Sequence, residues 1–365
     1  MNINNYIGKG KTGLKNMGNS CYVNALLQIL SHTYEMNDFL NTEYKTKLNH
    51  CIDSKLLVSW DELRKLMWSE NCTISPGAFM AHISEVSTIK KMELFSGMAQ
   101  NDLPEFLLFV FDTFHNALKR EVDMKIEGDV KNTRDKIAKS CYDMMIKEYS
   151  SNFSEILKLF YGIHVSTITM NPNVEYSDSD ILSIRTEAYM IISLPIPNKQ
   201  NSAAPVHLFD CMDLYCESEY LKGDNAWYNE NTKQKQDVYK RLRFWSLPQI
   251  MIIDLKRFEF NYKTMTFKKN KTNVQIPLTN VNFSKFVDGY NKEDYIYDLY
   301  GICNHHGTSD FGHYTSTVRL ADLKWYNFDD ESIKEIKSLN NDAVKGTELM
   351  GNTPYCLFYR KIQKL

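Results

Sequence analysis

The first part of the chain carries apolar residues at helical spacing. In the segment 21–30, apolar side chains recur at positions i, i+3, i+4 and i+7, which places them on one face of a helix: the residues are Val23, Leu26, Leu27 and Leu30. Residues 52–68, 103–120 and 133–160 predict further helices. We therefore expect the first 160 residues to be mainly helical.

The pattern changes after Phe160, where β-branched and aromatic residues partly alternate with polar ones. Such segments predict β-strands, here 162–170, 188–196, 248–260, 294–306, 312–320, 324–330 and 355–362. The last three segments predict the closing strands of an antiparallel sheet, and the polar stretch 217–237 predicts a loop. Because the helices come first and the strands follow, the fold class is α+β.

Composition and charge exclude several classes of partner. The formal net charge of −2 over 365 residues gives no large basic surface, so nucleic acid is not expected as a partner. The basic run Lys268-Lys269-Asn270-Lys271 predicts a solvated loop face. The N-terminal residues lack an apolar signal core, and no run of about 18 apolar residues predicts a membrane span.

The cysteines point to a reducing compartment. The chain has 8 of them at irregular spacing, without a CxxC pair, which argues against a disulfide scaffold. Together with the missing signal, this pattern predicts an intracellular protein, cytoplasmic or nuclear.

Cys21 occupies a position that favours reactivity. In the segment "GLKNMGNSCYVNALLQIL", a loop rich in Gly, Asn and Ser runs into the predicted helix, and Cys21 stands at the border. Free backbone N–H groups and the dipole at a helix N-terminus lower a thiol pKa and favour the thiolate. The alternative is an inert buried cysteine, which is the commoner role of a lone cysteine on a helix.

A thiolate that transfers acyl groups needs a base and a group that orients the base. His313 stands in "HHGTSDFGHYTSTVR", directly after Gly312 and at the start of a predicted strand. Asp329 ends another predicted strand, so two adjacent antiparallel strands would bring it beside the His313 ring. The alternatives are a loop histidine and a turn aspartate.

These segments together resemble the ubiquitin-specific protease family of papain-like cysteine proteases. The resemblance runs from about Gly13 to Lys361 and rests on several ordered motifs: "GLKNMGNSCYVNALLQIL", "AQNDLPEFLLFVFDTFH", "SLPIP", "LPQIMIIDLKRF", "YGICNHHGTSDFGHYTSTVR", "WYNFDDESI" and "YCLFYRK". It implies one catalytic domain over residues 1–365, with a helical thumb, an antiparallel-sheet palm and β-rich fingers. The thumb would span about 1–160, the fingers and inner palm strands 161–260, and the palm with the His/Asp box 261–365.

The resemblance also implies roles for the site residues. Cys21 matches the nucleophile, His313 the general base and acid, and Asp329 the residue that orients the histidine, with Asp330 as the fallback for that role. Asn16 matches the residue whose amide forms the oxyanion hole together with the Cys21 backbone N–H. The alternative for Asn16 is an Asx turn that only stabilises the loop.

The implied reaction is hydrolysis of the (iso)peptide bond after the C-terminal Gly-Gly of ubiquitin, through an acyl-enzyme intermediate. Gly312 and Tyr314 flank His313 and would wall a narrow channel for the two glycines. Asp102 and Glu105 match acids that meet arginines of the ubiquitin tail, but the same residues also form a helix capping box, with Asp102 as the cap.

The implied partners are ubiquitin and ubiquitinated proteins, with an unidentified activator protein as a further possibility. Two alternatives stay open. The chain could be a ubiquitin-binding scaffold that needs a partner for activity, or a protease for a ubiquitin-like modifier.

One departure from the family pattern concerns zinc. Many members carry two CxxC pairs in the fingers, and the matching positions here are Met170, Asn173, Asn229 and Thr232, which offer neither thiolate nor imidazole. We therefore expect no metal and no cofactor. Cys211 and Cys216, near His207, predict two buried or loop thiols.

Overall fold

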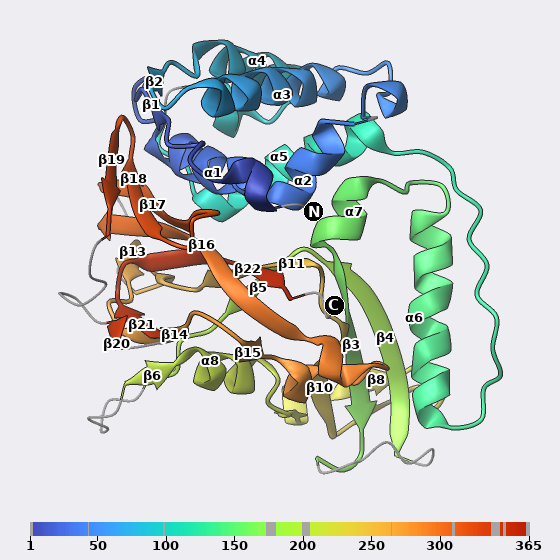
Figure 1. Cartoon of the computed structure of the whole chain (residues 1–365). Coiled ribbons are helices and arrows are strands. Elements are labelled where there is room, and N and C mark those ends of the chain that lie inside the picture. The colour runs from blue at the N-terminus through green and yellow to red at the C-terminus, as the bar shows by residue number, and fades with distance from the viewer. Residues whose placement is uncertain are drawn as a thin grey trace.

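The computed structural model describes residues 3–42, 44–97, 99–172, 180–198, 205–263, 265–308, 311–336, 344–345 and 348–362. Helices gather at the N-terminal end and sheets make up most of the rest (Figure 1). The described α-helices are α1 (Cys21–Ser31), α2 (Tyr34–Leu40), α3 (Asp53–Ser69), α4 (Gly77–Ile89), α5 (Leu103–Leu118), α6 (Thr133–Tyr149), α7 (Glu155–Phe160) and α8 (Leu208–Tyr215).

The strands fall into two main sheets and several small ones. Their bounds are β1 (Gly13–Leu14), β2 (Thr73–Ile74), β3 (Gly162–Thr169), β4 (Ile181–Tyr189), β5 (Ile191–Leu194), β6 (Val206–His207), β7 (Glu219–Leu221), β8 (Trp227–Asn229), β9 (Gln234–Gln236), β10 (Val238–Ser246), β11 (Ile250–Leu255), β12 (Phe258–Asn261), β13 (Thr266–Lys269), β14 (Val274–Pro277), β15 (Val281–Asn282), β16 (Ile296–Gly307), β17 (Gly312–Arg319), β18 (Trp325–Asp329), β19 (Ser332–Glu335), β20 (Val344–Lys345), β21 (Glu348–Gly351) and β22 (Pro354–Lys361).

The larger sheet, here called the palm sheet, has the order β19-β18-β17-β16-β22-β11-β5, and β15 also pairs with β16. Its pairs are antiparallel except for β11 and β5, which run parallel. All residues of β11 are buried, because helices α1 and α5 cover one face of the sheet and α8 lies in the core on the other. A strand buried on both faces reads as a continuous apolar run.

Helix α1 is the central element of the helical region at the N-terminal end of the chain. Every residue from Cys21 to Ser31 is buried, and the helix packs against β17, β16 and α5. Figure 1 shows α1 lying between the outer helices α3 and α4 and the palm sheet. This packing fixes the N-terminus of α1 at the sheet.

The second sheet, here called the fingers sheet, has the order β4-β3-β10-β7 and is antiparallel throughout. Helix α6 packs along β4 and stands beside the sheet in Figure 1. No helix in the described ranges is both long and apolar enough to cross a membrane.

The structure confirms most predicted elements and corrects some. The predicted helix over 133–160 is two helices, because the Ser154 side chain accepts a hydrogen bond from the Leu157 backbone (3.3 Å) and caps a new start. The predicted loop over 217–237 is partly wrong, since it contains the short strands β7, β8 and β9. Pattern analysis also missed α2, α4, α8 and β10.

The basic run at 268–271 is not uniformly solvated. Lys268 is exposed, as predicted, but Lys269 is half-buried and its Nζ lies 2.6 Å from the carbonyl oxygen of His305. The prediction for Lys269 is therefore wrong, because Lys269 is the last residue of β13 and its side chain turns inward to His305 instead of lying on a loop.

The zinc-ligand positions of the fingers hold a polar turn. Asn229 ends β8 and is buried; its Oδ1 accepts from the backbone N–H of Asn231 (2.9 Å) and its Nδ2 donates to Gln236 Oε1 (2.9 Å). Of the other three positions, Asn173 lies outside the described residues. Cys211 and Cys216 are both buried thiols, as predicted. An amide network thus closes the β8–β9 hairpin.

We expect this hairpin to depend on Asn229 and not on a metal. Replacing Asn229 by Ala should lower the free energy of unfolding by about 1–3 kcal/mol, because the Asn231 backbone N–H and Gln236 Oε1 lose their hydrogen-bond partner. Asn231→Ala, at an exposed neighbouring position, is the matched control. Chemical denaturation gives the difference. Equal stability of the two variants, or about one zinc per chain by metal analysis, would contradict this account.

Candidate active site

Cys21 is the first residue of α1, as the sequence predicted. The loop before it is held by the Asn16 side chain, whose Oδ1 accepts from the backbone N–H groups of Gly18 (3.0 Å) and Ser20 (3.3 Å). Gly18 has a φ of 95°, a conformation that glycine adopts readily. The loop and the helix together direct the thiol toward β17.

The thiol of Cys21 lies against the strand that carries His313. Burial raises the pKa of the Cys21 thiol, and the Asp330 carboxylate adds to the rise. Hydrogen bonds from the backbone of Tyr314, Tyr22 and Cys21 itself act in the opposite direction. The expected lowering of this pKa is therefore wrong: the backbone groups at the helix start do favour the thiolate, but the loss of water around a buried sulfur outweighs them.

His313 and Asp329 meet across two neighbouring strands. His313 Nε2 lies 2.6 Å from Asp329 Oδ1, and both side chains are partly exposed. The antiparallel pairing of β17 with β18 brings them together. With Nε2 engaged by the carboxylate, Nδ1 is the ring nitrogen left for another partner. Tyr314 follows His313 directly, and its backbone contacts the thiol, so His313 stands one residue along β17 from that contact.

Asp330 faces a different set of groups. Its Oδ2 accepts from Asn16 Nδ2 (2.8 Å) and its Oδ1 accepts from Asn24 Nδ2 (2.8 Å). Asp330 adopts a left-handed φ of 47°, and one oxygen of its carboxylate still lies within 4.8 Å of the Asp329 carboxylate and the His313 ring. The two adjacent acids thus have different hydrogen-bond partners: Asp329 contacts His313, and Asp330 accepts from Asn16 and Asn24.

The two interpretations of Asn16 turn out to be compatible. Its oxygen makes the Asx-type contacts to Gly18 and Ser20, while its nitrogen donates to Asp330. An amide nitrogen carries two protons, so one remains for a further acceptor. The residue is exposed at the mouth of the site.

Asp102 caps α5, as predicted. Its Oδ1 accepts from the Glu105 backbone N–H (3.3 Å) and its Oδ2 accepts from the Tyr355 hydroxyl (2.5 Å). Burial raises the pKa of this carboxyl group, and these two hydrogen bonds oppose the rise. Glu105 is exposed, and within the described part of the chain its carboxylate has no ion-pair partner. The two acids therefore differ: Asp102 is committed to the fold and Glu105 can meet a cation.

Gly312 lies where thumb and palm touch. Its carbonyl oxygen accepts from Gln100 Nε2 (3.1 Å), which precedes α5. A Cβ at this position would lie 2.0 Å from His305 Nε2, so only glycine fits. Tyr314 is buried, and its ring packs against those of His305 (4.8 Å) and Tyr355 (6.2 Å). Tyr314 thus supports the site from within.

Sequence reasoning missed three contributors, namely Asn24, Gln100 and His305. Asn24 stands three residues after Cys21, so helical spacing alone places it near the thiol on α1. His305 is the first histidine of a pair, and no local pattern separates its role from that of His306.

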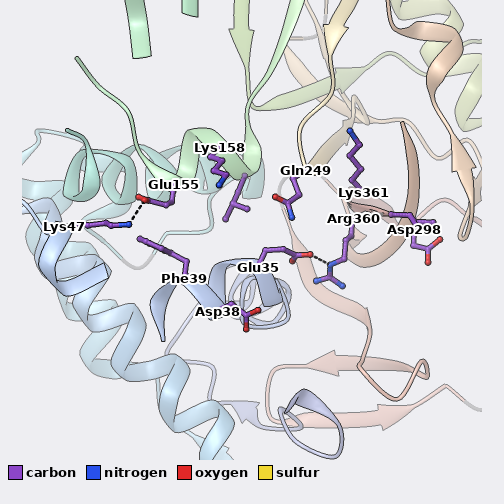
Figure 2. Close-up of a pocket in the computed structure, with 12 residues that line it drawn as sticks. Glu35, Asp38, Phe39, Lys47, Glu155, Lys158, Gln249, Asp298, Arg360 and Lys361 are labelled. Carbon is purple, nitrogen blue, oxygen red and sulfur yellow. Dashed lines mark hydrogen bonds and ion pairs between the residues drawn. The ribbon is translucent and has the colours of Figure 1, made fainter. Parts of the chain in front are cut away.

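A cleft of about 630 Å³ lies elsewhere, between α2, α7 and the ends of the palm strands (Figure 2). None of the predicted site residues lines it. Four of the charged side chains that line it pair with one another: Glu35 with Arg360 (2.8 Å) and Lys47 with Glu155 (3.1 Å). This cleft is therefore separate from the candidate site around Cys21.

Comparisons with known proteins agree with this geometry. The sequence model of the family described as ubiquitin carboxyl-terminal hydrolase matches residues 12–359, and the chain belongs to this family. It is 28% identical to human ubiquitin carboxyl-terminal hydrolase 2 over 365 residues, covering 98% of this chain and 56% of that protein. It is 26% identical to Drosophila melanogaster ubiquitin carboxyl-terminal hydrolase Usp2, covering 97% of this chain and 35% of that protein.

The chain thus spans about a third to a little over half of these relatives. Among solved structures, it resembles a chain of the SAGA DUB module of Ubp8, Sgf11, Sus1 and Sgf73 bound to monoubiquitin, with a TM-score of 0.70 and 21% identity over 97% of this chain and 70% of that chain. This likeness confirms the predicted α+β, papain-like fold. The residue bounds of thumb, palm and fingers stay a prediction.

The raised thiol pKa gives a test that is independent of substrate. In the His313→Ala variant, we expect the rate of Cys21 alkylation by iodoacetamide to rise with pH and to reach its midpoint above the ordinary thiol value of about 8.5. The sign follows from burial, which disfavours the anion and keeps the thiol protonated at neutral pH. Mass spectrometry of the Cys21 peptide measures the rate. A midpoint below the ordinary value would show that the helix terminus dominates.

Proposed function

We propose that this chain is a deubiquitinating cysteine protease that cleaves the (iso)peptide bond after the C-terminal Gly-Gly of ubiquitin. One observation carries the proposal: His313 Nε2 lies 2.6 Å from Asp329 Oδ1, and the backbone of Tyr314, the residue after His313 on β17, contacts the Cys21 thiol. Membership of the ubiquitin carboxyl-terminal hydrolase family supports the substrate. So does the monoubiquitin bound to the structurally similar SAGA module.

The first step is proton transfer. Since burial keeps the Cys21 thiol neutral, the sulfur becomes nucleophilic only when His313 Nδ1 takes its proton. Asp329 holds the other ring nitrogen and stabilises the imidazolium that forms. The sulfur then bonds to the carbonyl carbon of the last glycine, and the carbonyl oxygen becomes an anion.

The oxyanion meets two donors. The second proton of Asn16 Nδ2 and the backbone N–H of Cys21, at the open start of α1, supply them. His313 gives its proton to the leaving amine, and the carbon–nitrogen bond breaks to leave a thioester on Cys21. Water, deprotonated by His313, then attacks the thioester, which releases the ubiquitin carboxylate and restores the thiol.

Substrate choice follows from space and charge. We place the two glycines of the substrate beside Gly312, where the backbone before His313 carries no side chain because a Cβ would meet His305 Nε2. Glu105 is exposed for an arginine, whereas Asp102 is held by the cap and Tyr355. The eight cysteines are thiols, which suits an intracellular protein.

Turnover of ubiquitin bearing a C-terminal fluorogenic amide tests the function. We expect activity in the wild-type chain and in Cys72→Ala, an exposed control cysteine, and its loss in Cys21→Ala. A ubiquitin probe with a C-terminal electrophile should label the same two active proteins. Tight ubiquitin binding without labelling would mean a scaffold. Labelling only by a ubiquitin-like modifier would assign the other protease class.

A second prediction concerns the hydrogen bond that Asn16 Nδ2 donates to Asp330. Asp330→Ala should lower kcat by about 10²–10³-fold, as the loss of an oxyanion donor does, because the amide is no longer held in place. Asn16→Ala should lower kcat similarly, and the double variant should fall no further.

The exposed neighbour Glu331 provides the matched control, and Glu331→Ala should keep normal kcat. Additive losses in the double variant would contradict the shared role of Asp330 and Asn16.

A further inference from the structure

Lys269 makes an unusual pair of contacts beside the active site. It ends β13, and its Nζ lies 2.6 Å from the carbonyl oxygen of His305 and 2.9 Å from the Nδ1 atom of the same residue. One ammonium group therefore binds both the backbone and the ring of a single histidine on β16.

Buried Arg257 holds the base of this strand in place. It is fully buried and donates to the carbonyl oxygens of Asn270 (3.1 Å), Thr272 (2.9 Å) and Pro354 (2.6 Å). The residues that follow Lys269 are thus tied to the strand that pairs with β16. Lys269 reaches His305 from a fixed position and not from a free loop.

His305 in turn supports the residue that precedes His313. Its ring is 3% exposed, lies edge-on to Phe258 (5.1 Å) and Tyr314 (4.8 Å), and fills the space that a side chain at Gly312 would need. A tilt of this ring would therefore move the Gly312 backbone, and His313 with it.

The contacts also decide where the ring proton of His305 sits. An ammonium group can only donate, so Nδ1 must be the acceptor and the proton lies on Nε2, beside Gly312. Burial and the charge of Lys269 lower the pKa of His305 to about 4, so the ring is neutral at physiological pH. Burial, Arg257 and Lys271 lower the pKa of Lys269 to about 8.

We propose that Lys269 is a positioning residue for the catalytic centre. Lys269 holds the His305 ring in one tautomer and one orientation beneath Gly312. The His305 ring thereby fixes the approach of His313 to Cys21. The proposal rests on the proposed role of His313. The competing explanation is that Lys269 only fastens the β12–β13 hairpin to the palm sheet. That explanation predicts a loss of stability without a specific loss of kcat.

The variant that separates them is Lys269→Met, which keeps the length of the side chain and removes its donors. We expect kcat for the ubiquitin C-terminal amide to fall by about 10–100-fold, the scale of a small misplacement of a catalytic group, with KM within twofold. Lys268→Met, one residue away and exposed, is the matched control and should keep normal kcat. An unchanged kcat in Lys269→Met, or an equal loss in Lys268→Met, would overturn the proposal.

A spectroscopic measurement tests the tautomer without relying on turnover. Wild-type protein labelled with ¹⁵N-histidine should show His305 as a neutral ring with the proton on Nε2, the signal being assigned from its loss in His305→Gln. A ring protonated on Nδ1, or on both nitrogens, would overturn the proposal. If wild-type protein turns over no ubiquitin substrate, the proposed function fails, while a comparison of this spectrum with that of Lys269→Met still decides whether Lys269 sets the tautomer.

Discussion

The contact between the first turn of α1 and the start of β17 is the interaction on which the site depends. It joins Cys21 to the backbone of Tyr314, residues that lie near opposite ends of the chain. The helix is buried along its whole length, so its N-terminus has no freedom to move away from the sheet. Burial excludes water from the sulfur, and this raises the thiol pKa. The same packing that positions the nucleophile also makes it depend on a neighbouring base.

The pairing of strands β17 and β18 determines which side chains the two acids near this contact reach. β17 carries His313, and the antiparallel neighbour β18 ends in Asp329, so a carboxylate reaches the imidazole. The left-handed turn at Asp330 sends the next carboxylate back toward Asn16 and Asn24. A pair of adjacent acids thereby serves two functions, which neither acid could serve alone.

Sequence patterns predicted the elements that pack in regular ways. The apolar spacing of 21–30 predicted α1, and the β-branched and aromatic residues of 312–320 predicted β17, two elements that are buried along most of their length. The patterns were weaker in the short helices α2 and α8, and in β10, whose middle residues are half-buried or exposed on both faces, so these elements were missed. The thiol pKa was predicted in the wrong direction, since local helix position is visible in sequence but depth of burial is not. Lys269 was misjudged for the same reason.

The central claim is that the Cys21 sulfur reacts between the His313 ring on one side and Asn16 on the other. A crystal structure of the chain with ubiquitin aldehyde measures this directly. The account predicts a covalent bond from Cys21 Sγ, the former aldehyde oxygen within about 3 Å of Asn16 Nδ2 and the Cys21 backbone N–H, and His313 Nδ1 facing the adduct. An adduct on another cysteine, or a His313 ring turned away from Cys21, would contradict it.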